Sequence, residues 1–148
     1  PYKVRVSGRL KHFISAFGEH VIGKEVEQAL KEASVNTSIT VNEFTVAPQI
    51  NPDEGLPYHE WFIEFENEPN NEQDFIEVLE QSLQQQNSYY LDLIVGKVLR
   101  PLKITRIKKD GFQTYMKSIG KLGGQNKIPR LSNDRKIADV LYQLNLTK

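Results

Sequence analysis

Residues 7–27 read SGRLKHFISAFGEHVIGKEVE and place two structural signals back to back. The first predicts a small hairpin over residues 11–21, and the second predicts a helix over residues 24–33. The apolar positions of this helix have the spacing of one buried face: Val26, Ala29, Leu30 and Ala33. Gly18 and Gly23 supply the unusual backbone angles that a tight hairpin and a helix entry require. The stretch therefore predicts a hairpin that leads directly into a helix.

Two later runs of residues predict a long antiparallel hairpin. Residues 37–46 are rich in β-branched side chains, which favour strands, and residues 58–66 alternate between two faces. One face holds Trp61, Ile63 and Phe65, and the other holds Phe62, Glu64 and Glu66. We expect the two glutamates to face water, and we expect further strands at residues 1–7 and 102–107.

Apolar side chains at helical spacing predict three more helices. The clearest spans residues 72–86, Asp110 caps the next one, and a cap at residue 132 or 133 begins the last. Residues 87–98 fit either a strand or a helical extension. These elements predict an α+β fold, in which a small antiparallel sheet of three or more strands has helices packed on one face, plus an N-terminal hairpin.

Length and composition limit the class of protein. The 148 residues suffice for one domain with a real core but not for two, and 39% hydrophobic residues are typical of a folded chain. There is no membrane-spanning apolar run and no signal-peptide pattern. Because cysteine is absent, disulfides and thiolate chemistry are excluded, and we expect a cytoplasmic protein. The first residue is Pro1 rather than Met, as expected for a fragment or a processed chain.

Charge is balanced in total but divided along the chain. Residues 51–86 hold ten acidic and no basic side chains, whereas residues 97–136 hold twelve basic and two acidic ones. This division fits either two solvated faces or a basic surface that meets phosphate or another acidic partner. Sequence-specific DNA-binding domains usually carry a net basic charge, so we expect no nucleic-acid partner.

Several patterns imitate catalytic motifs without completing them. Gly18 and Gly23-Lys24 match the start of a phosphate-binding P-loop, but Glu25 occupies the position where Ser or Thr must hold Mg²⁺. Histidine can serve as a metal ligand or a general base, but the spacing of His12, His20 and His59 matches no zinc signature. We expect these histidines to be ordinary hairpin or strand-edge side chains. The chain by itself does not contain a complete active site.

The most informative loop spans residues 122–131 and reads LGGQNKIPRL. Within it, Lys127 follows the flexible Gly123-Gly124 pair and precedes the rigid Pro129. Such a loop can hold one ammonium group away from the domain surface, where it enters a partner domain and meets a phosphate. The alternative is that Lys127 is one of many solvated lysines.

Part of the first stretch resembles the hinge motif of adenylate-forming enzymes. The matching positions are Gly8-Arg9, Ile14, Gly18-Glu19, Val21 and Glu25-Val26-Glu27. This superfamily comprises acyl- and aryl-CoA synthetases, the adenylation domains of non-ribosomal peptide synthetases, and firefly luciferase. In its members the motif joins a large nucleotide-binding domain to a small C-terminal lid, and the hinge residue is usually Asp or Lys. The resemblance implies that Arg9 and Lys11 serve as the hinge.

From about residue 34 onward, the chain is similar to the C-terminal domain of one branch of this superfamily. The branch is the Gretchen Hagen three family, the auxin-responsive acyl-acid amido synthetases of plants and their bacterial relatives. The similarity rests on residues 56–65 (LPYHEWFIEF), on the pair NSYY at 87–90 and PLKI at 101–104, and on QNKIPR at 125–130. Plant members often lack the Gly-Arg hinge, so the chain looks like a bacterial-type member, and its substrate stays open.

The resemblance implies that residues 1–148 are the single C-terminal lid domain of a larger ligase. Its N-terminal domain, the lid's partner, would bind ATP, Mg²⁺ and a carboxylic acid, and the acyl group would pass through an acyl-adenylate to an amino acid or other amine. Lys127 is implied as the catalytic cation and Arg130 as its support. We expect neither a cofactor in the fragment nor a membrane partner. The alternative is a free-standing, non-catalytic module that binds a small molecule or a protein.

Overall fold

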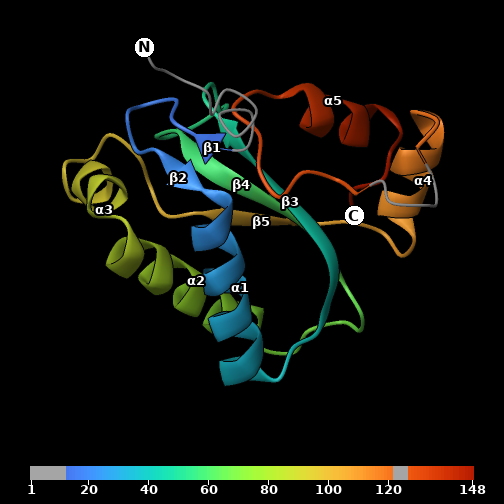
Figure 1. The fold of residues 1–148 in the computed structure, drawn as a ribbon, viewed down its shortest axis with the longest axis horizontal. Helices are drawn as coiled ribbons and strands as arrows, with labels where there is room; N and C mark the ends of the chain where they lie inside the picture. The colour runs from blue at the N-terminus through green and yellow to red at the C-terminus, as the bar shows by residue number, and fades with distance from the viewer. Residues whose placement is uncertain (1–12, 122–126) are drawn as a thin grey trace, which may run out of the picture.

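The computed structural model describes residues 13–121 and 127–148, and Figure 1 shows how their helices and strands are arranged. An N-terminal hairpin of β1 (Phe13–Ile14) and β2 (Val21–Ile22) leads straight into helix α1 (Gly23–Thr37). The hairpin and the helix agree with the prediction from the sequence. The strand expected at residues 1–7 lies outside the described ranges.

The centre of the fold is a three-stranded sheet in the order β3–β4–β5. Strands β3 (Val41–Gln49) and β4 (Tyr58–Phe65) form the predicted antiparallel hairpin, whereas β5 (Lys103–Arg106) pairs with β4 in parallel. The sheet is therefore mixed rather than wholly antiparallel. The reason is that two helices separate β4 from β5 in the chain. A crossover of this kind lets β5 run in the same direction as β4.

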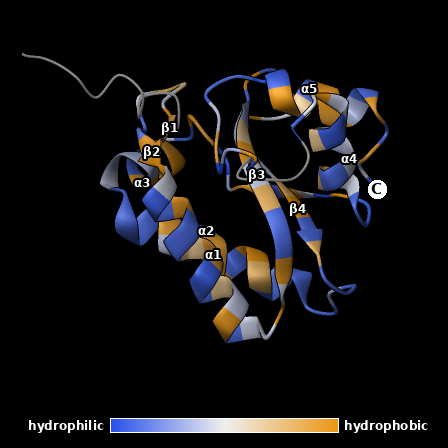
Figure 2. Ribbon diagram, turned by 45° about the vertical axis from the view of Figure 1, so that its right-hand side comes forward, coloured by the Kyte–Doolittle hydropathy of each residue, from blue (hydrophilic) through white to orange (hydrophobic). Residues whose placement is uncertain are grey.

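Helices α1 and α2 (Glu72–Gln86) pack against each other and cover one face of the sheet (Figure 1). Both helices alternate apolar and polar residues along their length (Figure 2), as amphipathic helices do. Between them and the sheet lies the larger core cluster, which includes Val26, Ala29, Trp61, Ile63, Phe75 and Leu79. The predicted alternation of β4 is confirmed, because Trp61 and Ile63 point into this core.

The opposite face of the sheet is also covered, by α4 (Gly111–Ser118) and α5 (Lys136–Gln143). These helices form a second core cluster with Ala47 of β3, Phe62 of β4, and Ile128. The sequence analysis expected helices on one face only. Phe62 is fully buried on the face opposite Trp61, so the central strand carries apolar side chains on both sides and both sides need cover.

Two predictions were wrong at Glu64: that this side chain faces water, and that the Asp110 side chain caps the following helix. Glu64 is only 6% exposed, and its carboxylate accepts hydrogen bonds from the backbone N–H groups of Asp110 (3.1 Å) and Phe112 (3.3 Å). Asp110 occupies the N-cap position of α4 without a side-chain cap bond. Glu64 of the neighbouring strand therefore satisfies the Phe112 amide, which the Asp110 side chain was expected to cap, and the amide of Asp110 itself. Glu66 is exposed, as predicted.

We expect Glu64→Ala to lower the free energy of unfolding by about 1–2 kcal/mol, the usual cost of losing a helix cap. Glu66→Ala, two residues along the chain and exposed, is the matched control and should change it by less than about 0.5 kcal/mol. Urea denaturation of the two variants measures the difference. Equal effects of the two substitutions would contradict the capping role.

The ambiguous stretch 87–98 contains a helix, α3 (Ser88–Val95). It starts at Asn87, whose side-chain oxygen accepts a hydrogen bond from the backbone N–H of Tyr90 at 2.9 Å. The last helix, α5, begins later than predicted: its N-cap position is Arg135, which makes no side-chain cap bond, and the preceding Asp134 carboxylate accepts from the backbone N–H of Lys136 at 3.0 Å. Within the described residues, no helix has the length and apolar character needed to cross a bilayer.

Candidate functional site

Lys127 lies at the surface, at the point where the chain enters the second core. Its side chain is exposed, whereas the next residue, Ile128, is only 4% exposed and packs with α4 and α5. The buried isoleucine fixes the backbone immediately after the lysine. The ammonium group therefore extends from an anchored position.

The segment that follows Lys127 is bound to strand β3. The Thr45 hydroxyl donates to the carbonyl of Pro129 at 2.7 Å, and the Val46 N–H donates to the carbonyl of Arg130 at 2.9 Å. The Ser132 N–H in turn donates to the carbonyl of Val46 at 2.9 Å, which completes a parallel bridge between Val46 and the fully buried Leu131. This segment, residues 129–132, therefore extends the central sheet. It anchors the backbone on the C-terminal side of Lys127.

Arg130 holds the same segment on β3 through its side chain. Its guanidinium forms an ion pair with the Glu43 carboxylate and lies over the Phe44 ring, 4.8 Å from the ring centroid. The sequence analysis expected Arg130 to support Lys127. The structure gives Arg130 partners on β3, so any support it provides acts through the position of the backbone. The expected hinge residues, Arg9 and Lys11, lie outside the described ranges.

The acidic and basic stretches of the sequence partly pair with each other. Arg106 donates to Glu68 at 2.9 Å and to Glu72, and Arg135 donates to the buried Glu60 at 2.7 Å. These pairs join β5 and α5 to the acidic part of the chain. Exposed lysines stay around α4 and the following loop: Lys108, Lys109, Lys117, Lys121 and Lys127. Lys127 thus belongs to a part of the chain that is rich in exposed lysines.

Glu60 also fixes α5, which follows the Lys127 segment. Its carboxylate accepts hydrogen bonds from the hydroxyls of Thr105 (2.6 Å) and Tyr142 in addition to the Arg135 guanidinium. Burial, helped by the hydrogen bond to Glu60, raises the pKa of Tyr142 to about 12. The hydroxyl therefore keeps its proton at neutral pH and donates to the carboxylate.

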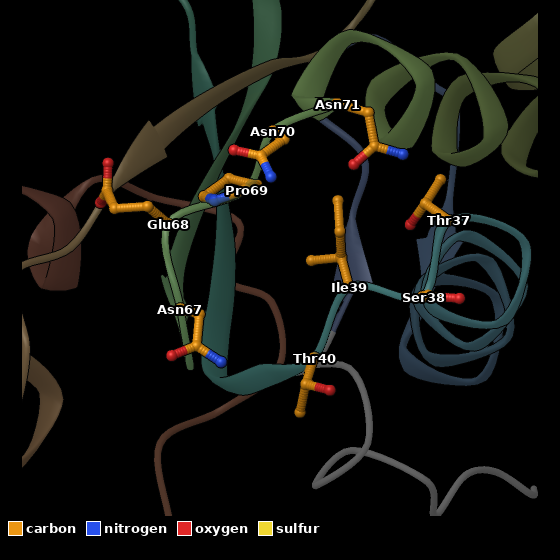
Figure 3. Close-up of a pocket in the computed structure, with 9 residues that line it drawn as sticks. All are labelled: Thr37, Ser38, Ile39, Thr40, Asn67, Glu68, Pro69, Asn70 and Asn71. Carbon is orange, nitrogen blue, oxygen red and sulfur yellow. The ribbon is translucent and has the colours of Figure 1, made fainter.

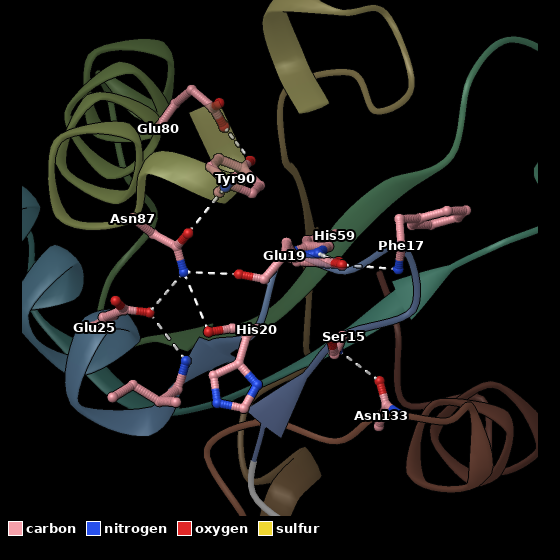
Figure 4. A network of polar contacts seen from close by, with 11 residues as sticks. Ser15, Phe17, Glu19, His20, Glu25, His59, Glu80, Asn87, Tyr90 and Asn133 are labelled. Atoms are coloured by element: carbon pink, nitrogen blue, oxygen red, sulfur yellow. Dashed lines mark hydrogen bonds and ion pairs between the residues drawn. The ribbon is translucent and has the colours of Figure 1, made fainter. Parts of the chain in front are cut away.

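A buried polar cluster joins the N-terminal hairpin to the sheet (Figure 4). Glu19, in the hairpin turn, is fully buried, and its carboxylate lies 2.6 Å from Nε2 of His59 on β4. The same carboxylate accepts a hydrogen bond from the backbone N–H of Phe17 at 2.8 Å. His59 is 1% exposed and its ring contacts Tyr90, with ring centroids 5.3 Å apart. The prediction of an ordinary strand-edge histidine was therefore wrong for His59.

Asn87 connects this cluster to the junction of α2 and α3. Its side-chain amide donates to the carbonyls of Glu19 at 3.0 Å and His20 at 3.2 Å. Tyr90, one turn further on, donates its hydroxyl to Glu80 at 2.8 Å, and burial raises the pKa of Tyr90 well above its usual value. The sequence carried a signal for this cluster, because Glu19, His59 and Asn87 each lie in a motif that matched a family pattern, but none was selected as a functional residue.

The Glu19 carboxylate should make stability depend on pH. Burial acts to raise its pKa, but the hydrogen bond and charge of His59, together with backbone amides, outweigh burial and leave the pKa of Glu19 below its usual value of 4.5. A lowered pKa in the folded state gives a stabilisation that is complete above the unfolded value and is lost as pH falls through the folded one.

We therefore expect the free energy of unfolding to decline as pH falls below about 4.5. Because glutamine does not titrate, the decline should be shallower in Glu19→Gln. Urea denaturation at several pH values between about 3 and 6 measures this difference. If the free energy of unfolding falls equally steeply with decreasing pH in the original chain and in the variant, the assignment to Glu19 is contradicted.

A polar hollow lies elsewhere, between the end of α1 and the turn before α2 (Figure 3). Its volume is about 230 Å³, and it is lined by Thr37, Ser38, Ile39, Thr40, Asn67, Glu68, Pro69, Asn70 and Asn71. Neither Lys127 nor Arg130 lines it. Among the described residues, no three His, Asp or Glu side chains gather closely enough to hold a metal ion. Lys127, the cation predicted from the sequence, is exposed next to the buried Ile128.

Comparisons with known proteins agree with the resemblance seen in the sequence. Two solved structures share the fold: a GH3.15 acyl acid amido synthetase (TM-score 0.73, 18% identity, 95% of this chain and 27% of that one) and AtGH3.15 acyl acid amido synthetase in complex with 2,4-DB (TM-score 0.71, 17% identity, 93% and 26%). The chain thus spans roughly a quarter of the length of these proteins. A search of curated protein sequences found no relative. The family model described as the GH3 family C-terminal domain matches residues 24–136, so the chain belongs to the GH3 family and corresponds to its C-terminal domain.

Proposed function

We propose that this chain is the mobile C-terminal lid domain of an ATP-dependent ligase that forms acyl-adenylates and joins a carboxylic acid to an amino acid or other amine. Membership of the GH3 family, together with two structural relatives that are acyl acid amido synthetases, supports the reaction class. The observation that carries the proposal is the position of Lys127, which is exposed on a backbone held by Ile128 and by the bridge to β3. This arrangement suits a cation that is delivered to a partner domain.

ATP with Mg²⁺, bound mainly by the N-terminal domain, would supply the adenylyl group. In the first half-reaction a carboxylate oxygen bonds to the α-phosphorus and pyrophosphate leaves. Lys127 would stabilise the negative charge that develops on the α-phosphate oxygens, because a fixed cation in a site from which water is excluded interacts more strongly than one in water. In the second half-reaction the amine nitrogen bonds to the acyl carbon, AMP leaves, and the amine loses a proton.

The two half-reactions place different demands on the lid. Lys127 is needed while pyrophosphate leaves, whereas the amine must then approach the acyl carbon. A rotation about a few residues can exchange these arrangements, and Arg9 and Lys11 are proposed for that hinge. A cytoplasmic location and the lack of nucleic-acid and membrane partners stay predictions from the sequence.

The proposal is tested by ATP–pyrophosphate exchange with the intact parent enzyme over a panel of carboxylic acids, with the 148-residue chain alone as a control. We expect exchange by the parent with at least one acid and none by the chain alone, because most of the nucleotide site would lie in the N-terminal domain. If a folded parent shows no exchange with any acid, the proposal fails and the non-catalytic binding module becomes the better explanation.

A further inference from the structure

The N-terminal hairpin is too small to hold its own position. Each of its strands has two residues, and an isolated two-stranded hairpin is at best marginally stable in water. Its orientation must therefore come from contacts with the rest of the domain. These contacts matter because the hairpin directly follows the segment that contains the proposed hinge.

The first contact is the buried pair of Glu19 and His59. Taking a carboxylate out of water is costly, and well-packed apolar side chains often stabilise a fold as much as a buried ion pair does. What a carboxylate adds is direction, because its oxygens must meet donors at hydrogen-bond distance. Here one oxygen meets Phe17 of the hairpin and the other meets His59 of β4, so the turn of the hairpin is fixed relative to the central strand.

The second contact is the Asn87 side chain, which is 6% exposed. Its amide nitrogen lies within hydrogen-bond distance of two consecutive hairpin carbonyls, those of Glu19 and His20, and of the Glu25 carboxylate of α1 (3.1 Å). Its oxygen caps α3 by accepting from Tyr90. One side chain therefore bonds the hairpin and the α2–α3 junction at the same time (Figure 4). His20 has a left-handed backbone (φ 49°), an uncommon state for a residue other than glycine, and the bond from Asn87 to its carbonyl helps to hold that state.

The third contact joins the hairpin to the part of the chain that follows Lys127. The Ser15 N–H donates to the Asn133 side-chain oxygen at 2.8 Å, across 118 residues of sequence. Asn133 lies directly after the segment 129–132 that is bound to β3. The hairpin is thus tied to β4, to the α2–α3 junction and to the chain that positions Lys127.

We propose that Glu19, His59 and Asn87 are positioning residues that make the β1–β2 hairpin part of the rigid body of the lid, so that rotation before Phe13 is passed fully to Lys127. This inference rests on the proposed function. With these contacts in place, the described part of the lid moves as one unit. Without them, the hairpin could rotate without moving Lys127. The ammonium group would then not reach the phosphate.

Asn87→Asp tests the proposal in the intact parent enzyme. Aspartate keeps the oxygen that caps α3 but has no amide hydrogens for the hairpin carbonyls, and its charge repels both these carbonyls and the Glu25 carboxylate at the start of α1. Asn36→Asp is the matched control, since Asn36 donates to the carbonyl of Glu32 on the exposed side of α1. We expect Asn87→Asp to slow pyrophosphate exchange by up to about 100-fold, because small misplacements of a catalytic group have effects of that size. The control should be unchanged.

A double-mutant cycle with Lys127→Ala separates positioning from general destabilisation. If Asn87 acts through Lys127, Asn87→Asp should add little to the loss already caused by Lys127→Ala. Equal fold losses in the original and the Lys127→Ala backgrounds would overturn the proposal.

Pulsed electron paramagnetic resonance gives a readout independent of activity. Spin labels are attached in the intact enzyme at Ala16→Cys in the hairpin and Val35→Cys, a 72% exposed position on α1. We expect one narrow distance distribution that does not change with ATP and acid, and a broader one in Asn87→Asp. A distribution that shifts with substrates in the enzyme with native Asn87 would overturn the rigid-body assignment. Failure of the proposed function would appear differently, as absence of pyrophosphate exchange in the unsubstituted enzyme.

Discussion

Replacing Lys127 with alanine in the intact parent enzyme should slow ATP–pyrophosphate exchange by about 10²–10³-fold, equivalent to about 3–4 kcal/mol of lost transition-state stabilisation. The lysine side chain is exposed, and the backbone on its C-terminal side is held by Ile128 and by the bridge between Val46 and Leu131. Truncation should therefore remove the charge without disturbing the fold. The rate of exchange at saturating ATP and acid measures the effect.

Lys121 provides the matched control for this experiment. It is also an exposed lysine, and it lies just before residues 122–126, whereas Lys127 lies just after them. Lys121→Ala should leave the exchange rate within about twofold, since surface charges away from a site contribute little. Lys127→Arg should recover only part of the rate, because a planar guanidinium does not place its charge as an ammonium does. If Lys127→Ala retains the original exchange rate, Lys127 has no part in adenylation.

Removing one partner of the buried Glu19–His59 pair should have the largest effect on stability. His59→Ala leaves the fully buried Glu19 carboxylate facing a cavity, with backbone amides of the turn, such as that of Phe17, as its remaining partners. Breaking a buried pair in this way typically costs about 3–5 kcal/mol. Since small domains are stable by only about 5–15 kcal/mol, a large fraction of the variant should unfold at low urea concentrations.

Trp61 allows this prediction to be measured without a label. It is the only tryptophan in the chain and is fully buried beside Phe44, so its fluorescence should shift to longer wavelength on unfolding. Adding Glu19→Gln to His59→Ala should recover part of the loss, because a neutral amide is less costly to bury than a carboxylate. His20→Asn is the control, because it changes an exposed histidine to a residue that tolerates the same left-handed backbone. A cost below about 1 kcal/mol for His59→Ala would contradict the role of the pair.

Local patterns in the sequence determined the individual elements. Helical spacing located α1 and α2, and the two-residue alternation of β4 identified which side chains point to which face. These predictions succeeded because periodicity depends on neighbouring residues, which share one element and one buried face. The motifs also indicated the family, because their order and spacing can be read directly from one sequence.

The pairing of elements was decided by the tertiary structure. Periodicity indicates that Phe62 or Glu64 lies on a given face of a strand, but it does not identify what covers that face. The parallel direction of β5 depends on the helical crossover, and the burial of Glu64 depends on α4 starting beside it. Alternation alone therefore predicted a solvated carboxylate where the fold places a helix cap.

The same limit applies to the functional residues. The sequence alone singled out Lys127, because its loop composition is local, and pointed to Arg130 through a family motif. It did not reveal that Arg130 pairs with Glu43, 87 residues away, or that Glu19 meets His59 across 40 residues. Such contacts form only when the sheet, the hairpin and the helices have packed, because the position of each partner depends on the register of a different element. The sequence thus determined which residues could carry the chemistry, and the packing of the fold determined which of them hold the others in place.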